Sequence, residues 1–82
     1  MSENAALGEQ VRGIVADRLR VDSEAVSAET EFAGKTLDAD SLDLVEIAEA
    51  VDDELDVYVP DRALSEVDTV ADLTEAVRSH RE

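Results

Sequence analysis

Apolar side chains recur every three or four residues along most of this chain, a spacing that predicts helices packed through one face. A first helix is expected from about Asn4 to Arg20, with Asn4 as its N-cap, and a second from Ser41 to Leu55, with Asp40 as its N-cap. The residues expected to face the core are Leu7, Val11, Ile14, Val15 and Leu19 in the first helix, and Leu44, Ile47, Ala48, Val51 and Leu55 in the second.

Two more helices are expected in the C-terminal third. A short one is predicted from Asp61 to Glu66, directly after Pro60. A longer one begins at the N-cap candidate Thr69, which has Asp72 three residues on. Its apolar stripe is Val70, Leu73, Ala76 and Val77.

The connection between the first two helices is long, running from Val21 to Lys35, and Val21, Val26 and Phe32 are expected to pin it to the core. With only 82 residues, the chain is expected to be one domain over 1–82, with 1–4 and 79–82 frayed. The fold class is therefore predicted as an all-α bundle with a long loop between helices 1 and 2 and a short helix 3.

The charge of the chain restricts its partners. Asp and Glu total 22 against seven Lys and Arg, a formal net charge of −15. Such a chain repels nucleic acid and anionic membrane surfaces and favours partners with basic surfaces. Lys35 is the only lysine, so we interpret the composition as adaptation to high salt, with an ordinary acidic protein as the alternative. Folding should then strengthen with added KCl.

Other compositional features exclude several classes of protein. The chain has no cysteine, which excludes disulfides and cysteine-based zinc sites. No stretch is apolar for the roughly 18 residues that a membrane span needs, and the N-terminus lacks the pattern of a signal peptide. The protein is expected to be a cytoplasmic monomer that does not insert into membranes.

Two apolar residues of the second helix point away from its core face. Leu42 and Val45 lie roughly 100–150° from the core stripe, on the side of Glu46, Glu49, Asp52 and Asp53. They can form a docking patch in an acidic field, or they can be ordinary exposed residues on a solvated face.

The sequence Leu-Asp-Ala-Asp-Ser-Leu over residues 37–42 resembles the attachment motif of acyl carrier proteins. The similarity continues in the same order through Val45-Glu46, residues 52–57, Val59-Pro60-Asp61 and residues 67–70. It covers about Leu7 to Val77, nearly the whole chain. The resemblance implies a four-helix acyl-carrier-protein-like bundle.

The resemblance also implies a function. Ser41 would receive 4′-phosphopantetheine from coenzyme A and hold acyl groups as thioesters on that arm, as a carrier that catalyses nothing itself. The partners would be a phosphopantetheinyl transferase and acyl-loading and acyl-processing enzymes of fatty-acid, related lipid or polyketide biosynthesis. Asp40 directly before Ser41 favours acyl cargo, but an aminoacyl or other cargo and an unmodified acidic interaction module remain alternatives. By the same resemblance, the docking residues would be Asp40, Asp43, Glu46, Asp52 and Asp53, with Leu42 and Val45 between them.

The sequence departs from the family pattern in three ways. Asp38 stands where the family usually has glycine, and Lys35-Thr36 lengthens the approach to Leu37 by about one residue. Both bear on the loop before Ser41. Glu49 replaces a position that is often apolar and implies a more polar docking face.

Two other functions of the segment around Ser41, a catalytic serine and a calcium-binding loop, lack residues that they require. A serine nucleophile needs a base, and the chain has no Gly-x-Ser-x-Gly motif and a single histidine, His80, expected at the solvent-facing end of the last helix. Asp38, Asp40 and Glu49 match positions 1, 3 and 12 of a calcium loop, but its positions 5 and 6 would be Leu42 and Asp43. No specific metal site is therefore expected. A serine at a helix start is also common for structural reasons alone.

Overall fold

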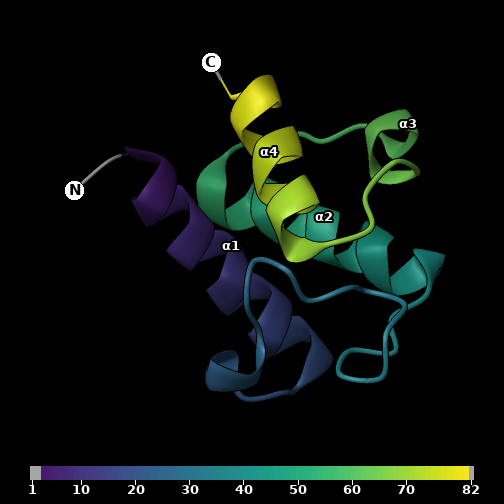
Figure 1. Ribbon diagram of the computed structural model, residues 1–82. Coiled ribbons are helices and arrows are strands. Elements are labelled where there is room, and N and C mark those ends of the chain that lie inside the picture. Colours follow the sequence, from purple (N-terminus) through teal and green to yellow (C-terminus); the bar gives the residue numbers. More distant parts are fainter. Residues whose placement is uncertain (1–2, 82) are drawn as a thin grey trace.

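The computed structural model describes the backbone of residues 3–81 and the side chains of residues 6–81. This part of the chain contains four α-helices (Figure 1). They are α1 (Glu3–Leu19), α2 (Ser41–Leu55), α3 (Asp61–Leu64) and α4 (Val70–His80). A short 3-10 helix, η1 (Ser23–Ala25), lies in the long connection between α1 and α2. The predicted all-α bundle with a long first loop and a short third helix is confirmed.

The core lies where α1 packs against both α2 and α4 (Figure 1). The apolar faces predicted from the sequence are buried, apart from Leu19, Leu44, Leu55 and Ala76, which are half-buried and pack against the core. Among the described residues no polar or charged side chain is buried. The hydrophobic effect therefore dominates the stability of this bundle.

The ends of α1 differ from the prediction by one residue. The helical turn that holds Leu7 in the core extends back to Glu3, so Asn4 lies inside α1 and its prediction as N-cap is wrong. At the other end Arg20 takes a left-handed φ of 58°, and the N–H of Val21 donates to the carbonyl of Ala16 at 3.0 Å. This arrangement is a helix-ending motif usually built with glycine.

Thr69 caps α4 as predicted. Its Oγ1 accepts a hydrogen bond from the N–H of Asp72 at 3.2 Å, and the Asp72 carboxylate accepts from the N–H groups of Asp68 at 3.0 Å and Thr69 at 3.1 Å. These backbone donors, that of Asp68 first, hold the pKa of Asp72 below its ordinary value. The cap fixes the direction in which the chain enters α4.

The third helix is shorter than predicted, ending at Leu64 rather than Glu66. The N–H of Glu66 bonds to the carbonyl of Ala63, and the Ser65 hydroxyl donates to the carbonyl of Arg62 at 2.8 Å. Hydrogen bonds between residues three apart in sequence tighten the last turn of a helix and stop α-helical propagation.

The long loop is fixed against the start of α4. The N–H of Phe32 donates to the carbonyl of Asp68 at 2.9 Å, and the N–H of Val70 donates to that of Thr30 at 3.0 Å. Val26 and Phe32 are buried as predicted, and Val21 is half-buried. The loop therefore has a definite position, and Phe32 is held beside α2.

Two predictions concern the whole chain, the fraying of its ends and the lack of a membrane-spanning segment. The backbone is helical at residues 3–4 and 79–80, whereas 1–2 and 82 lie outside the described residues, so the fraying of 1–4 and 79–82 stays a prediction. None of the described helices combines the length and the apolar character needed to cross a bilayer.

Candidate functional site

Ser41 is the first residue of α2, and the two aspartates around it build the helix start. The Asp40 carboxylate accepts from the N–H of Asp43 at 2.9 Å, and the Asp43 carboxylate accepts from the N–H of Asp40 at 3.1 Å. The predicted N-cap is therefore confirmed and is a complete capping box. Because the two carboxylates bind each other's backbone, the exposed Ser41 side chain is left at the positive end of the helix.

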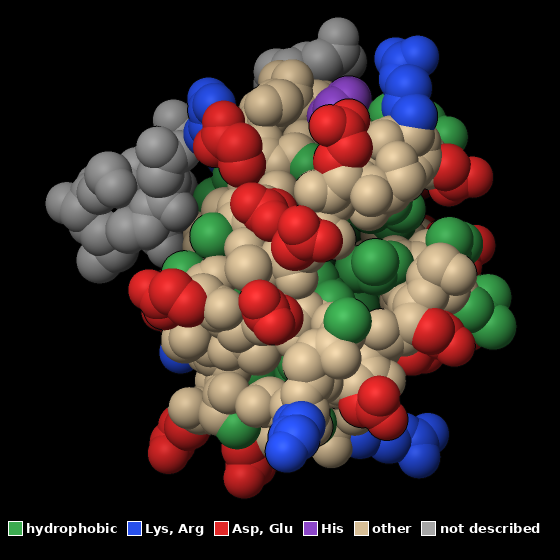
Figure 2. Space-filling view, turned by 45° about the vertical axis from the view of Figure 1, so that its right-hand side comes forward, with side chains coloured by type: hydrophobic (Ala, Val, Ile, Leu, Met, Phe, Trp, Pro, Cys, Tyr) green, Lys and Arg blue, Asp and Glu red, His purple; other side chains and the backbone are tan. Residues whose placement is uncertain are grey.

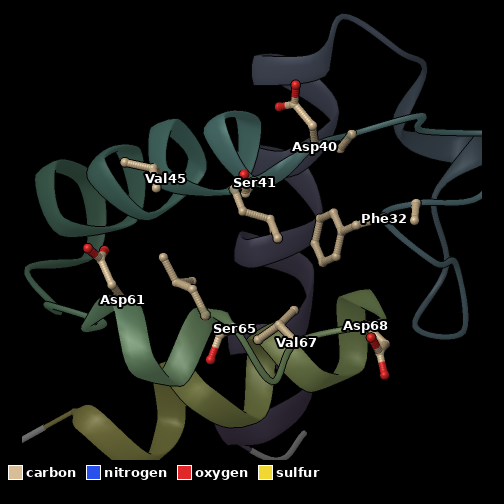
Figure 3. Close-up of a pocket in the computed structure, with 12 residues that line it drawn as sticks. Phe32, Asp40, Ser41, Val45, Asp61, Ser65, Val67 and Asp68 are labelled. Carbon is tan, nitrogen blue, oxygen red and sulfur yellow. The ribbon is translucent and has the colours of Figure 1, made fainter.

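A cavity of about 560 Å³ opens beside Ser41, between α2, α3 and the long loop (Figure 3). Phe32 directs its ring into the cavity from the loop, while Val45 lies on α2 and Val67 follows α3 (Figure 3). The complete lining is Phe32, Ala33, Ala39, Asp40, Ser41, Leu44, Val45, Asp61, Leu64, Ser65, Val67 and Asp68. An exposed hydroxyl thus stands at the edge of a mostly apolar cavity, a combination typical of a binding site for an apolar group.

The surface around this cavity is acidic. Figure 2 shows acidic side chains spread over the face, hydrophobic side chains in recesses between them, and basic side chains mainly toward the upper and lower edges. No basic residue occurs between Lys35 and Arg62, the stretch that contains all of α2. An approaching partner therefore meets a negative potential along the whole helix.

The predicted docking residues lie on the outer side of α2. Leu42 is 63% exposed and Val45 38% exposed, which makes them two of the three exposed large hydrophobic residues in the described part of the chain. Asp43 is half-buried because it belongs to the cap. Asp40, Glu46, Asp52 and Asp53 are exposed. Asp52 and Asp53 lie roughly 16–18 Å along the helix axis from Ser41, so the predicted surface is a long strip and not a compact patch.

The loop before Ser41 keeps a left-handed turn without the glycine. Asp38 has a φ of 46°, in the region that glycine adopts most easily. The N–H of Asp38 donates to the carbonyl of Gly34 at 2.7 Å, and the N–H of Gly34 donates to that of Glu31 at 3.2 Å. These bonds close a turn that accommodates Lys35-Thr36. Asp38 in place of glycine and the longer loop are therefore both compatible with an ordered loop before Ser41.

Replacing Asp38 by glycine should stabilise the protein by about 0.5–1 kcal/mol, because it relieves the left-handed strain of a residue with a side chain. Urea unfolding followed by circular dichroism measures this gain. Asp22→Gly is the matched control, since it removes the same charge from the same loop at a φ of −66°. The control should destabilise, and equal stabilisation by both changes would contradict the assignment of strain to Asp38.

Several cavity residues were not predicted as part of the site. Asp61, Leu64 and Val67 come from α3 and the segment after it, far from the motif in sequence. Leu64 and Val67 are buried but were not predicted as core residues, and their apolar character is the one sequence signal for them. It cannot indicate that they face Ser41, because that depends on how α3 packs against α2.

The site lacks the parts of a serine hydrolase among its described residues. His80 is the last residue of α4, is exposed, and its Nδ1 lies 2.9 Å from the carbonyl oxygen of Ala76. It does not line the cavity beside Ser41. The calcium-loop alternative fails as well, because residues 41–49 are helical. Within residues 3–81 no three acidic or histidine side chains form a group able to hold a metal ion.

Comparison with known proteins agrees with the resemblance of the motif. The sequence model described as "Phosphopantetheine attachment site" matches residues 9–77. The chain is 36% identical over 74 residues to an acyl carrier protein of Clostridium acetobutylicum, covering 90% of this chain and 95% of that protein. It is 41% identical over 73 residues to one of Akkermansia muciniphila, with 89% of each chain covered. It is 42% identical over 71 residues to one of Thermosynechococcus vestitus, covering 87% and 86%.

Members of this family carry covalently attached 4′-phosphopantetheine and act as carriers, not as catalysts. The residues of this chain fit such a group, because an exposed serine at a helix start stands beside an apolar cavity. The match over residues 9–77 and the identity along most of the length of each relative lead to one assignment: the chain belongs to the phosphopantetheine-binding acyl carrier protein family.

Proposed function

We propose that Ser41 is the attachment residue and that the protein carries acyl groups as thioesters for fatty-acid or related lipid or polyketide biosynthesis. The observation that carries this proposal is the exposed hydroxyl of Ser41 at the start of α2, on the edge of the apolar cavity. When attached, the group supplies a flexible arm that ends in a thiol.

The helix start suits the product of the modification. Esterification of the Ser41 hydroxyl creates an anionic phosphodiester, which the free N–H groups and the dipole of a helix N-terminus favour. Asp38, Asp40 and Asp43 oppose it by their negative charge. We therefore expect Mg²⁺ and basic residues of the transferase to assist the attachment.

The modification can be tested by intact-mass measurement. The protein is incubated with coenzyme A, Mg²⁺ and a phosphopantetheinyl transferase, and it should gain the mass of one phosphopantetheine moiety. Ser41→Ala should gain none. Ser65→Ala is the matched control, because Ser65 is a second exposed serine in the same cavity wall, and it should be modified like the unchanged protein. No gain in the unchanged protein, or an equal gain in Ser41→Ala, defeats the proposal.

The cavity supports shelter for the cargo. Its wall of Phe32, Leu44, Leu64 and Val67 is apolar and begins beside Ser41, so part of an acyl chain can leave water there. A crystal or solution structure of a long-chain acylated form with the whole chain in solvent would contradict this role.

The outer side of α2 supports docking to basic partners. The exposed Leu42 and Val45 lie among carboxylates, so a partner can combine apolar contact with long-range attraction. The docking set remains Asp40, Leu42, Asp43, Val45, Glu46, Asp52 and Asp53. An aminoacyl or other cargo is the alternative within this proposal, whereas an unmodified interaction module is excluded only by a positive mass result. The cytoplasmic location and the monomeric state stay predictions.

A further inference from the structure

A second hollow lies between α1, the long loop and α4, and we call it the α1–α4 hollow. Its volume is about 530 Å³, and it shares no lining residue with the cavity beside Ser41. The two helices pack directly against each other (Figure 1). The loop is fixed to α4 there, because the N–H of Ala71 donates to the carbonyl of Ala28 at 2.8 Å. The walls of this hollow are therefore parts of the packed bundle.

The charge around the α1–α4 hollow differs from that around the cavity beside Ser41. Its lining contains Arg12 and Arg78 together with Glu9 and Glu75, so its formal charges balance. The lining of the cavity beside Ser41 contains three carboxylates and no basic residue. Two of the seven Lys and Arg residues of the chain thus lie around one hollow, in a protein with a net charge of −15. An anion meets less repulsion in this hollow than beside Ser41.

The two arginines differ in how their donors are used. Arg78 binds Glu75 with two bonds, from Nε to Oε2 at 3.0 Å and from Nη2 to Oε1. Arg12 donates from Nη2 to Oε2 of Glu9 at 2.8 Å, but its Nε is buried and has no hydrogen-bond partner in the described part of the chain. The Nε–Nη2 edge of a guanidinium binds both oxygens of one carboxylate. That edge is filled on Arg78 and half-filled on Arg12.

The half-filled edge of Arg12 favours a ligand with a carboxylate. A buried donor without an acceptor costs free energy, because it has lost its hydrogen bonds to water and gained none. A ligand oxygen that accepts from Nε removes this cost. The present partner is weakly held, since the Glu9 side chain is 70% exposed and makes a single bond to Arg12. The Arg12 side chain is itself 33% exposed, so a rotation of its end is enough to bring Nε to a ligand that displaces Glu9.

The rest of the lining indicates what the carboxylate is attached to. Small and apolar residues lie between the charged ones, namely Gly8, Ala28, Val70 and Ala71. A Cβ at Gly8 would have no atom within 4 Å, so the missing side chain leaves space open. We propose that the α1–α4 hollow binds a small aliphatic carboxylate, with its oxygens on Nε and Nη2 of Arg12 and its tail on the apolar residues. This site goes beyond the proposed carrier function and does not depend on it.

Titration with hexanoate tests the site. Labelled full-length protein is titrated at constant ionic strength, and the Nε–H signal of Arg12 and the amide signals of Gly8 and Ala71 are followed by NMR. Hexanoate should shift all three with a Kd at least about threefold lower than that of formate, which lacks the tail, and that of 1-hexanol, which lacks the charge. Shifts confined to Phe32 and Leu64 would place hexanoate in the other cavity and overturn the inference.

Variants of Arg12 separate the guanidinium edge from its charge. Arg12→Gln removes both, whereas Arg12→Lys keeps the charge and removes the edge, and each should raise the Kd of hexanoate at least about fivefold. Arg18→Gln is the matched control, because Arg18 is an exposed arginine of α1 outside the hollow, and it should change the Kd less than about twofold. Equal effects of Arg12→Gln and Arg18→Gln, or unchanged binding in Arg12→Lys, would overturn the inference.

A change at Glu9 should strengthen binding. Glu9→Gln replaces the charged acceptor that occupies Nη2 of Arg12, and it should lower the Kd of hexanoate about twofold to fivefold, which corresponds to the loss of a competing exposed ion pair. Glu24→Gln makes the same change at an exposed position outside the hollow and should have a smaller effect. A Kd that Glu9→Gln leaves unchanged or raises, or equal gains in both variants, would contradict displacement of Glu9 by the ligand and overturn the proposed binding mode.

Discussion

Phe32→Ala should cost about 3 kcal/mol of unfolding free energy, the lower end of the usual range of 3–5 kcal/mol for loss of a buried phenylalanine. The ring is 2% exposed and connects the long loop to the core. We expect the lower end because the ring already borders the cavity beside Ser41, so its removal enlarges an open space and does not create a sealed one. A domain of this size has a total stability of roughly 4–12 kcal/mol, so the loss is large.

Urea unfolding followed by far-ultraviolet circular dichroism measures this loss. Tyr58→Ala is the natural control, because Phe32 and Tyr58 are the only two aromatic residues and Tyr58 is 68% exposed. The control should change stability by less than about 0.5 kcal/mol. A cost below 1 kcal/mol for Phe32→Ala would show that the loop does not depend on this anchor.

Raising KCl from a few millimolar to 1 M should raise the melting temperature by about 10 °C. Two unit charges 10 Å apart in water repel by about 0.4 kcal/mol, and a chain with a net charge of −15 contains many such pairs. At 1 M salt the Debye length falls to about 3 Å, which removes most of this repulsion. A gain of about 2 kcal/mol corresponds to a shift of this size for a domain of fewer than 100 residues.

Thermal melts followed by circular dichroism at both salt concentrations check the prediction. The ion pairs of Glu9 with Arg12 and of Glu75 with Arg78 lie at the surface, so the attractions that salt weakens there are small. A triple variant with Asp52→Asn, Asp53→Asn and Glu54→Gln should show a smaller gain, because less repulsion remains to be screened. Identical melting temperatures in low and high salt would reject the salt-adapted interpretation.

The features that the sequence predicted well depend on neighbours along the chain. The bounds of α2 were predicted as Ser41 to Leu55 and are confirmed, because the cap of Asp40 and the apolar spacing are local properties. The same holds for Thr69 at the start of α4. The errors are at helix ends, at Asn4 and at the end of α3, where periodicity gives a weak signal.

The candidate site also has features that the sequence predicted and features that it did not. A serine at a helix start, with exposed Leu42 and Val45 among carboxylates, follows from the sequence alone. The cavity does not, because Phe32 comes from the long loop and Leu64 and Val67 come from α3 and the turn after it, and these parts of the chain meet α2 only through packing. The left-handed turn at Asp38 also depends on its bond to Gly34 and on the position of the loop.

By itself, the sequence determined the course of the helices, the caps of α2 and α4, the acidic surface and the place of Ser41, since each depends on residues within a turn or two of one another. Only the tertiary structure decided that a cavity opens beside Ser41 and that Phe32, Leu64 and Val67 line it together. The physical reason is that a cavity is the space left when distant segments pack, and its shape depends on their relative positions more than on the pattern of any one of them.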